Sequence, residues 1–406
     1  MKTSTGPIGN IQNPKKPINI VGGGFSGLVM AYFLQKEGFK FTLFENESLG
    51  GKLQTIKTEY GLVEYAANAI YSNHDVDELI KDLNLNPVYA KSKLKKWLWR
   101  GLPSSPLTFF QIVKILPKVF SKIPNRNFRD LSIYDFFSPL LGEELAYDLL
   151  SAIFGGVYAI DSKKLSFTSV FKNPVKAQTY FQFFIEQRKL KKKNYKAKSI
   201  SFQGGMADLC LALRESVAGS IQRSRISKVD DVDNWIICTD AHSASTILDN
   251  EVSEVLKKIE YTPLTTTTLF SKSRVEFLKK SFGIVIPPKY GFKTKGVLAN
   301  TEIFNRPLTS FNSYTFIAQG LNDNDQEFYK EVDKLISIKE EEICGTFSMK
   351  WDKAIPVYDI QREENILRLR RLLLESNNLI LFGNYIDGIS LREIVTMAKN
   401  FARSLK

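Results

Sequence analysis

The fold of this chain is decided by residues 18–55, which read INIVGGGFSGLVMAYFLQKEGFKFTLFENESLGGKLQT. The segment opens with an apolar run at 18–21 that is typical of a buried parallel strand. A glycine-rich turn follows, and apolar residues then recur at helical spacing until Gly38. Residues 41–44 predict a second strand, with Glu45 at its end. This order of elements predicts an α/β, Rossmann-like unit.

The turn has the spacing G-x-G-x-x-G, which is typical of a dinucleotide-binding site. Gly22 allows the sharp turn, Gly24 lets the backbone approach a pyrophosphate, and Gly27 lets the helix pack closely on the strand. The helix N-terminus offers free N–H groups to the phosphates. Glu45 lies about twenty residues further on, where a carboxylate can bind the ribose hydroxyls. The predicted cofactor contacts in this unit are Gly22, Gly23, Gly24, Phe25, Ser26, Gly27 and Glu45.

Composition and charge narrow the choice of partners and compartment. The chain has 406 residues and a formal net charge of +13, which suits nucleic acid, an anionic membrane or an acidic substrate. No nucleic-acid-binding signature is present, so no nucleic-acid partner is predicted. The three cysteines are far apart and the first residues lack a signal-peptide pattern, which predicts a cytoplasmic location. Two isolated histidines predict no metal site, and no apolar run is long enough to span a membrane.

Three further segments predict parts of a cofactor site. Residues 60–70 form a strand that runs into a small-residue turn, where Ala67 and Asn68 would lie against a flavin ring. Strands at 225–229 and 235–239 predict a hairpin in which Ile226 meets the adenine by its backbone. After a strand at 379–382, a second glycine turn opens the final helix and suits the anionic edge of a reduced flavin.

The middle of the chain predicts two helical regions and a sheet. Residues 91–130 mix lysines with aromatic residues such as Trp97, Trp99 and Phe110. This pattern fits either an interfacial helix on anionic lipid or a packed helix with a solvated lysine edge. Residues 131–154 predict a helix that Gly155 and Gly156 break, and residues 261–319 predict an antiparallel sheet above the cofactor.

The segment Leu49-Gly50-Gly51-Lys52 resembles the G-G-[RK]-x-x-[TS] signature of amine oxidases, phytoene desaturases and protoporphyrinogen oxidases. The glycines let the chain pass close to a cofactor, and the lysine can face a phosphate or a substrate anion. Most of the chain is similar to the protoporphyrinogen oxidase family. The similarity is carried by GVYAIDSKKLS at 156–166, FGIVIP at 282–287, AIPVY at 354–358 and ILFGNYIDGISLREIV at 380–395.

This resemblance implies non-covalent FAD and oxidation of a porphyrinogen in haem biosynthesis, with oxygen or a quinone as electron acceptor. It also implies peripheral attachment at the inner face of a membrane through helices. No side chain is assigned as a catalytic base. The resemblance adds cofactor contacts at Gly51, Lys52, Ile226, Gly383, Asn384, Ile389, Ser390 and Leu391.

The expected architecture is a Rossmann-like FAD-binding domain of the glutathione-reductase type, a mixed α+β substrate domain and a helical subdomain. Residues 1–15 are expected to be a flexible tail. The FAD-binding domain is assigned to 16–88, 200–250 and 352–406. The helical, membrane-binding subdomain is assigned to 91–199 and the substrate domain to 251–351.

One departure from the family keeps other functions open. The family's E-x-G-P-R reads Glu64-Tyr65-Ala66-Ala67-Asn68 here, so the arginine expected near the substrate is absent. Two alternatives therefore remain. One is an FAD-dependent desaturase or amine oxidase acting on an isoprenoid or amine, and the other is a non-catalytic binding protein with a flavoprotein fold.

Overall fold

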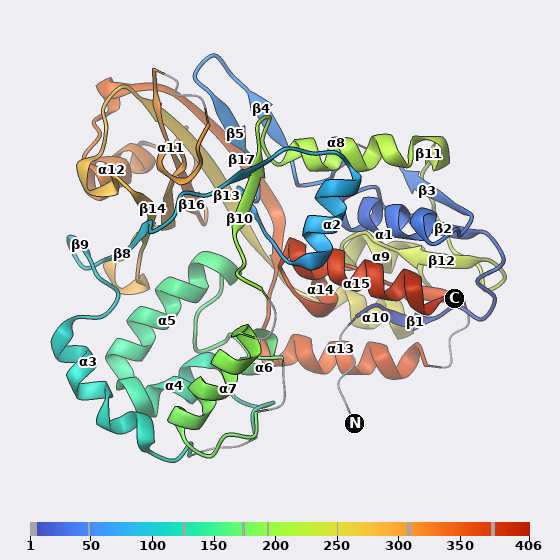
Figure 1. Cartoon of the computed structure of the whole chain (residues 1–406), viewed down its shortest axis with the longest axis horizontal. Coiled ribbons are helices and arrows are strands. Elements are labelled where there is room, and N and C mark those ends of the chain that lie inside the picture. The colour runs from blue at the N-terminus through green and yellow to red at the C-terminus, as the bar shows by residue number, and fades with distance from the viewer. Residues whose placement is uncertain are drawn as a thin grey trace.

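The structure is a computed structural model, and it describes residues 6–47, 49–124, 127–172, 175–192, 195–249, 251–306, 310–374 and 378–406. Figure 1 shows three interleaved bodies. A sheet between helices lies on the right, a larger sheet on the upper left and a group of helices on the lower left.

The first body is a six-stranded sheet whose central strands are parallel. Successive side chains in these strands enter different cores: Ile20 and Ile236 face one, while Val21 and Ile237 face the other. Burial on both faces explains why the strands read as continuous apolar runs. The strand order is β1 (Ile8–Asn10), β18 (Leu379–Leu381), β12 (Asn234–Ile237), β2 (Ile18–Val21), β3 (Phe41–Glu45) and β11 (Ile221–Arg223).

Helices cover both faces of this sheet and make it a three-layer unit (Figure 1). One core contains residues from α1 (Phe25–Lys36), α2 (His74–Asp82), α8 (Ala207–Ser216) and α15 (Leu391–Ser404). The other contains residues from α9 (Ala241–Ile247), α10 (Glu251–Lys257), α13 (Ile360–Leu372) and α14 (Asn384–Asp387).

The second body is a seven-stranded sheet, and the predicted antiparallel strands of residues 261–319 lie within it. Its long strands β13 and β17 pair along most of their length and run toward the first body (Figure 1). The order is β17 (Ile343–Pro356), β13 (Tyr261–Ser271), β16 (Asn312–Ala318), β15 (Thr294–Ala299), β14 (Ser281–Val285), β8 (Lys95–Trp99) and β9 (Pro103–Ser104). Helices α11 (Asn300–Ile303) and α12 (Gln326–Ile336) and the short turns η3 (Glu276–Leu278), η4 (Pro288–Tyr290) and η5 (Glu340–Glu342) belong to the same region.

The third body is helical and packs around an aromatic core that includes Phe136, Phe167 and Phe183. It consists of α3 (Phe109–Ile115), η1 (Pro117–Phe120), α4 (Ile133–Leu141), α5 (Glu143–Tyr158), α6 (Phe167–Val170) and α7 (Tyr180–Lys192). Within the described ranges, no helix is long and apolar enough to cross a membrane.

Two small sheets and one short 3-10 helix complete the set of elements. Strands β4 (Thr55–Lys57) and β5 (Leu62–Glu64) form a hairpin. Strand β10 (Ser199–Phe202) lies between β6 (Ile70–Tyr71) and β7 (Pro87–Tyr89), and η2 (Ala218–Ser220) precedes β11.

The structure corrects two predicted boundaries: the end of the N-terminal tail and the start of the helical subdomain. The expected N-terminal tail is wrong for residues 8–10, because Ile8 is buried and β1 pairs antiparallel with β18. The expected helical start at 91 is also wrong, because β8 and β9 extend the second sheet. Trp99 is buried in that sheet, and the Trp97 indole N–H donates to the Phe277 carbonyl at 2.9 Å.

The predicted hairpin at 225–229 and 235–239 is wrong as well. The strand before it, β11, ends at Arg223 and is parallel to β3. Strand β12 instead lies between β2 and β18. Its apolar run suits a central parallel strand, which is buried on both faces, better than one arm of an exposed hairpin.

The predicted helix break at Gly155 and Gly156 does not occur. Helix α5 continues to Tyr158 and ends where Ala159 adopts φ +53°. Gly156 lies beside β14, where an added Cβ would meet the Val285 side chain at 3.5 Å, an ordinary packing distance. Tertiary packing therefore overrides the low helix propensity of the two glycines.

Candidate functional site

The candidate site lies where three parallel strands of the first sheet end side by side. The Gly22 N–H donates to the Phe44 carbonyl at 2.9 Å, and the Cys238 N–H donates to Val21 at 2.8 Å. The Phe382 N–H donates to Ile237 at 2.9 Å. The early glycine turn, the end of β12 and the late glycine turn therefore meet at one edge. In parallel α/β sheets, ligands bind outside the carboxyl ends of the strands.

The early glycine turn has the geometry that its sequence predicts. Gly22 adopts φ +104°, which favours glycine. A Cβ on Gly27 would lie 1.9 Å from the Gly22 carbonyl oxygen, so only glycine lets α1 pack this closely on the turn. Gly24 is the N-cap of α1, no side chain caps the helix, and its first turn has no acidic residue. The N–H groups at this end are therefore available to an anion.

Glu45 lies directly over this turn. One carboxylate oxygen accepts the Gly23 N–H at 2.6 Å, and the other accepts the Glu47 N–H at 2.7 Å. The neighbouring strand in the sheet is β11, and just after it the Ser224 N–H donates to the Glu45 carbonyl at 3.2 Å. Ile226 follows Ser224 by two residues and packs, partly buried, against the second core of the sheet. Glu45 is the last residue of β3 and Ile226 lies just beyond β11, and their contacts with a cofactor stay predictions.

The Leu49–Lys52 segment lies against the same turn. The Gly50 N–H donates to the Gly23 carbonyl at 2.8 Å, and a Cβ on Gly51 would lie 3.1 Å from the Gly24 Cα. The Lys52 ammonium donates to the Lys353 and Ala354 carbonyls of β17, the second at 3.3 Å, and burial lowers its pKa. Lys52 therefore ties the turn to the second sheet, and its contact with a phosphate or substrate stays a prediction.

The late glycine turn connects all three bodies. Gly388 adopts φ +131°, and Ser390 is the N-cap of α15 with no side-chain cap bond. Ile389 packs against the helical body, whereas Leu391 packs against the first sheet. The Tyr358 hydroxyl donates to the Asn384 carbonyl. The predicted contacts Gly383, Asn384, Ile389, Ser390 and Leu391 therefore share one turn, which starts at the end of β18.

Several residues that support this turn were not predicted from the sequence. The guanidinium of Arg362, which is buried, donates to the Tyr385 carbonyl at 3.0 Å and to the Ile386 carbonyl. Lys172, from the helical body, donates to the Asp387 carbonyl and to the Glu393 carboxylate at 2.9 Å. No local pattern marks these residues, because their partners come from other parts of the chain.

The small-residue turn at 66–68 lies between β5 and β6. Ala67 packs, partly buried, against the first sheet. The Asn68 amide donates to the Asn300 side chain at 2.9 Å and lines a cavity of about 410 Å³. We call it the hairpin cavity, because the β4–β5 hairpin and α11 border it. Its lining includes Lys57, Glu64, Asn68, Lys91, Asn300 and Arg306.

The geometry fits a dinucleotide cofactor on the chain's own evidence. An added Cβ on Gly27 or Gly51 would crowd neighbouring backbone, one on Gly23 would meet the Leu49 and Glu45 side chains, and an uncapped helix end faces the turn. Among the described residues, no group of three or more His, Cys, Asp or Glu side chains could hold a metal ion.

Comparisons with known proteins find relatives that span most of the chain. Residues 20–83 match the family model described as an NAD(P)-binding Rossmann-like domain. Protoporphyrinogen oxidase 2 of Arabidopsis thaliana is 23% identical, with 92% of this chain and 91% of that protein covered. Coproporphyrinogen III oxidase of Bacillus subtilis is 21% identical, with 95% and 97% covered.

Solved structures extend the agreement to the fold. A crystal structure from Exiguobacterium sp. 255-15 that bears the name protoporphyrinogen oxidase has a TM-score of 0.77 at 18% identity, covering 98% of this chain and 99% of that one. A putrescine oxidase has a TM-score of 0.71 at 12% identity, covering 96% and 98%. The comparisons confirm the predicted resemblance and the Rossmann-like fold.

Proposed function

We propose that this chain, an FAD-dependent oxidoreductase resembling protoporphyrinogen oxidase, oxidises a porphyrinogen to the corresponding porphyrin. The observation that carries the proposal is the meeting of both glycine turns, Glu45 and the Leu49–Lys52 segment at one sheet edge. The porphyrinogen is supported by relatives of that name, which match over more than nine-tenths of the chain.

FAD supplies the redox chemistry, namely acceptance of a hydride equivalent from a substrate carbon. The residues of the chain bind and orient the cofactor. The N–H groups at the start of α1 would hold the phosphates, and Glu45 would accept hydrogen bonds from the ribose hydroxyls. The N-terminus of α15 places its positive dipole end beside the late turn, where it would stabilise negative charge on the cofactor. Oxygen or a quinone would serve as the electron acceptor.

The test uses the purified full chain. A yellow protein with a flavin spectrum is expected. Coproporphyrinogen III or protoporphyrinogen IX should bleach it without oxygen, and porphyrin fluorescence should appear when oxygen or a soluble quinone is added. A flavin that stays oxidised with both porphyrinogens would refute the proposed substrate class.

A second candidate is oxidation of an amine. It is favoured by Asn68, which stands where the porphyrinogen-oxidising family has an arginine, and by a fold shared with putrescine oxidase. Bleaching of the flavin by an amine such as putrescine, and not by porphyrinogens, would select this function. Bleaching by an isoprenoid alone would instead select a desaturase.

The enzyme would act at the inner face of a membrane. Helix α3 has no buried residue, and it exposes Phe109 by 74% and Phe110 by 79%. Phe120 of η1 is also exposed and stacks on Phe181 of α7 at 5.0 Å. Lys114, Lys118 and Lys122 are exposed in the same stretch of the chain and suit anionic lipid headgroups. Trp97 and Trp99, which were predicted to share this surface, belong to the second sheet instead.

A further inference from the structure

The hairpin cavity carries an excess of positive charge. Its lining contains three cations, Lys57, Lys91 and Arg306, and one carboxylate, Glu64. Both lysines are exposed, whereas Arg306 is largely buried. A hollow with this net charge attracts organic anions.

Arg306 is held rigidly at the inner side of the cavity. Its Nε donates to the Phe202 carbonyl at 3.2 Å, and its Nη2 donates to the same carbonyl at 3.0 Å and to the Ser201 hydroxyl at 2.5 Å. Nη1 makes no hydrogen bond to any residue that the structure describes. The guanidinium therefore keeps two N–H donors in a fixed position, as needed for carboxylate recognition.

Glu64 neutralises only part of the positive charge that lines the cavity. Its carboxylate accepts the Thr55 hydroxyl at 2.6 Å and the Met206 N–H at 2.9 Å, and it lies 4.0 Å from Arg306. Burial raises the pKa of Glu64, and burial also lowers the pKa of Arg306. At Arg306 the lowering by burial exceeds the raising by Glu64 and Asp208, so these carboxylates offset only part of the cost of burying the guanidinium.

The cavity also adjoins the predicted cofactor and contains an unpaired polar atom. Asn68 follows Ala67, which is predicted to lie against the flavin ring. Its amide is oriented by Asn300, which in turn donates to the Thr315 hydroxyl at 2.7 Å. The Asn68 Oδ1 is buried without a hydrogen-bond partner in the described residues. An unpaired buried acceptor is costly, so a ligand with an N–H or O–H group is expected beside it.

We propose that the hairpin cavity binds carboxylate side chains of the substrate, with Arg306 as the buried anchor and Lys57 and Lys91 at the rim. This inference rests on the proposed function. Position 68 lacks the arginine of the porphyrinogen-oxidising family. Its role would pass to Lys57 in the hairpin, Lys91 after β7 and Arg306 after α11. The substrate class is thereby a carboxylate-bearing tetrapyrrole, not a neutral isoprenoid or an amine.

The test compares the wild type with Lys57→Gln/Lys91→Gln and with Arg306→Gln, each as the FAD-loaded full chain. We expect the rim double variant to raise KM for coproporphyrinogen III about tenfold and to leave kcat within about twofold, because the lysines do not contact the reacting carbon. Arg306→Gln should raise KM further, and Arg306→Lys should restore part of the loss. Lys334→Gln, on α12, serves as the control and should leave KM unchanged.

Direct binding keeps the inference testable without turnover. Fluorescence titration with coproporphyrin III should show the same order of affinities. Its tetramethyl ester, in the same detergent, should bind wild type and rim variant equally. Arg306→Gln also removes bonds to Ser201 and Phe202, so its flavin content and circular dichroism are measured in parallel. Wild-type KM and porphyrin affinity in the rim variant would overturn the inference, whereas a wild-type flavin that no porphyrinogen reduces would refute the proposed function itself.

Discussion

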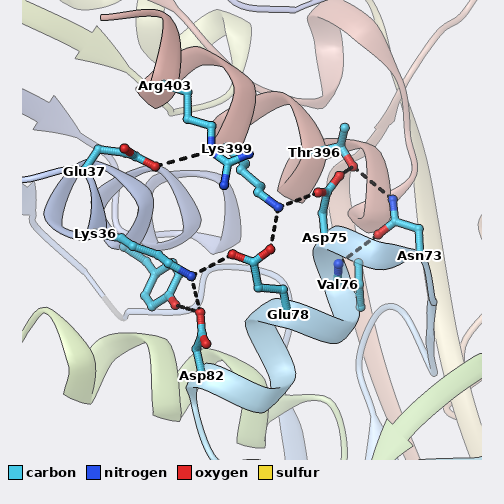
Figure 2. A network of polar contacts seen from close by, with 11 residues as sticks. Lys36, Glu37, Asn73, Asp75, Val76, Glu78, Asp82, Thr396, Lys399 and Arg403 are labelled. Carbon is cyan, nitrogen blue, oxygen red and sulfur yellow. Dashed lines mark hydrogen bonds and ion pairs between the residues drawn. The ribbon is translucent and has the colours of Figure 1, made fainter. Parts of the chain in front are cut away.

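Replacing Lys399 with methionine should destabilise the first body, because this ammonium connects two helices. Figure 2 shows it between two carboxylates of α2. Lys399 Nζ lies 2.7 Å from Asp75 and 2.7 Å from Glu78, and its side chain is only 8% exposed. The network continues to α1 through Lys36, which lies 2.7 Å from Glu78. Methionine keeps most of the length of the unbranched side chain and removes the charge.

The expected loss in the free energy of unfolding depends on how deeply the two ion pairs of Lys399 are buried. Breaking a fully buried ion pair costs about 3–5 kcal/mol. Here the carboxylates are 23% and 35% exposed, and each keeps another partner: Thr396 for Asp75 and Lys36 for Glu78. Water and these partners offset part of the loss. We therefore expect a decrease of about 2 kcal/mol in the free energy of unfolding.

The pH dependence gives a second readout of the same contact. Hydrogen bonds from Lys36 and Lys399 lower the pKa of Glu78 to about 2. Burial acts against the shift at Asp75, but hydrogen bonds from Lys399 and Thr396 still lower its pKa. A carboxylate with a depressed pKa in the folded state stabilises above its unfolded pKa, and this stabilisation is lost as pH falls toward the folded value. The difference between wild type and Lys399→Met should therefore shrink from about pH 5 toward pH 2.

The assay is urea unfolding followed by far-ultraviolet circular dichroism at pH 7, 5 and 3. The control is Lys257→Met, which removes an exposed ion pair with Glu254 and should leave the unfolding midpoint unchanged. If both variants unfold at the wild-type urea concentration, or if the effect of Lys399→Met is the same at pH 3 as at pH 7, the reasoning about this network is wrong.

Three further predictions test the site and the membrane contact. Glu45→Gln should weaken FAD binding about tenfold, because a charged acceptor is lost; flavin fluorescence titration measures this, and an unchanged affinity would exclude the ribose contact. Gly27→Ala should yield colourless protein with a lower melting temperature, because its Cβ would lie 1.9 Å from the Gly22 oxygen; a yellow protein of wild-type stability would contradict the packing argument. Phe109→Ser/Phe110→Ser should reduce flotation with anionic liposomes while flavin content stays constant, and undiminished flotation would reject this surface as the lipid contact.

The sequence predicted the parts of the fold that depend on local pattern. Residues 18–45 form the strand, turn, helix and strand expected, and Gly22 and Gly27 have the geometry their positions require. The late turn begins at the expected strand, because a short apolar run followed by Gly383 is a local signal. These signals lie within one stretch of chain.

The features that were missed depend on contacts between distant segments. Strand β1 has three residues, and its burial follows from pairing with a strand at the other end of the chain. Gly156 lies within α5, which packs on β14 and β15 of the second sheet. Arg306 gains its role from Ser201 and Phe202, which lie about one hundred positions earlier. No periodicity in the sequence encodes such pairings.

The position of β18 between β1 and β12 also affects how the protein is made. On a translating ribosome, β1 emerges long before its sheet partner at Leu379–Leu381 has been synthesised. The apolar edge left open in the nascent chain is a surface that chaperones recognise and that promotes aggregation. A polypeptide that stops before Leu379 would therefore lack the strand that joins β1 to β12, however complete its first three hundred residues.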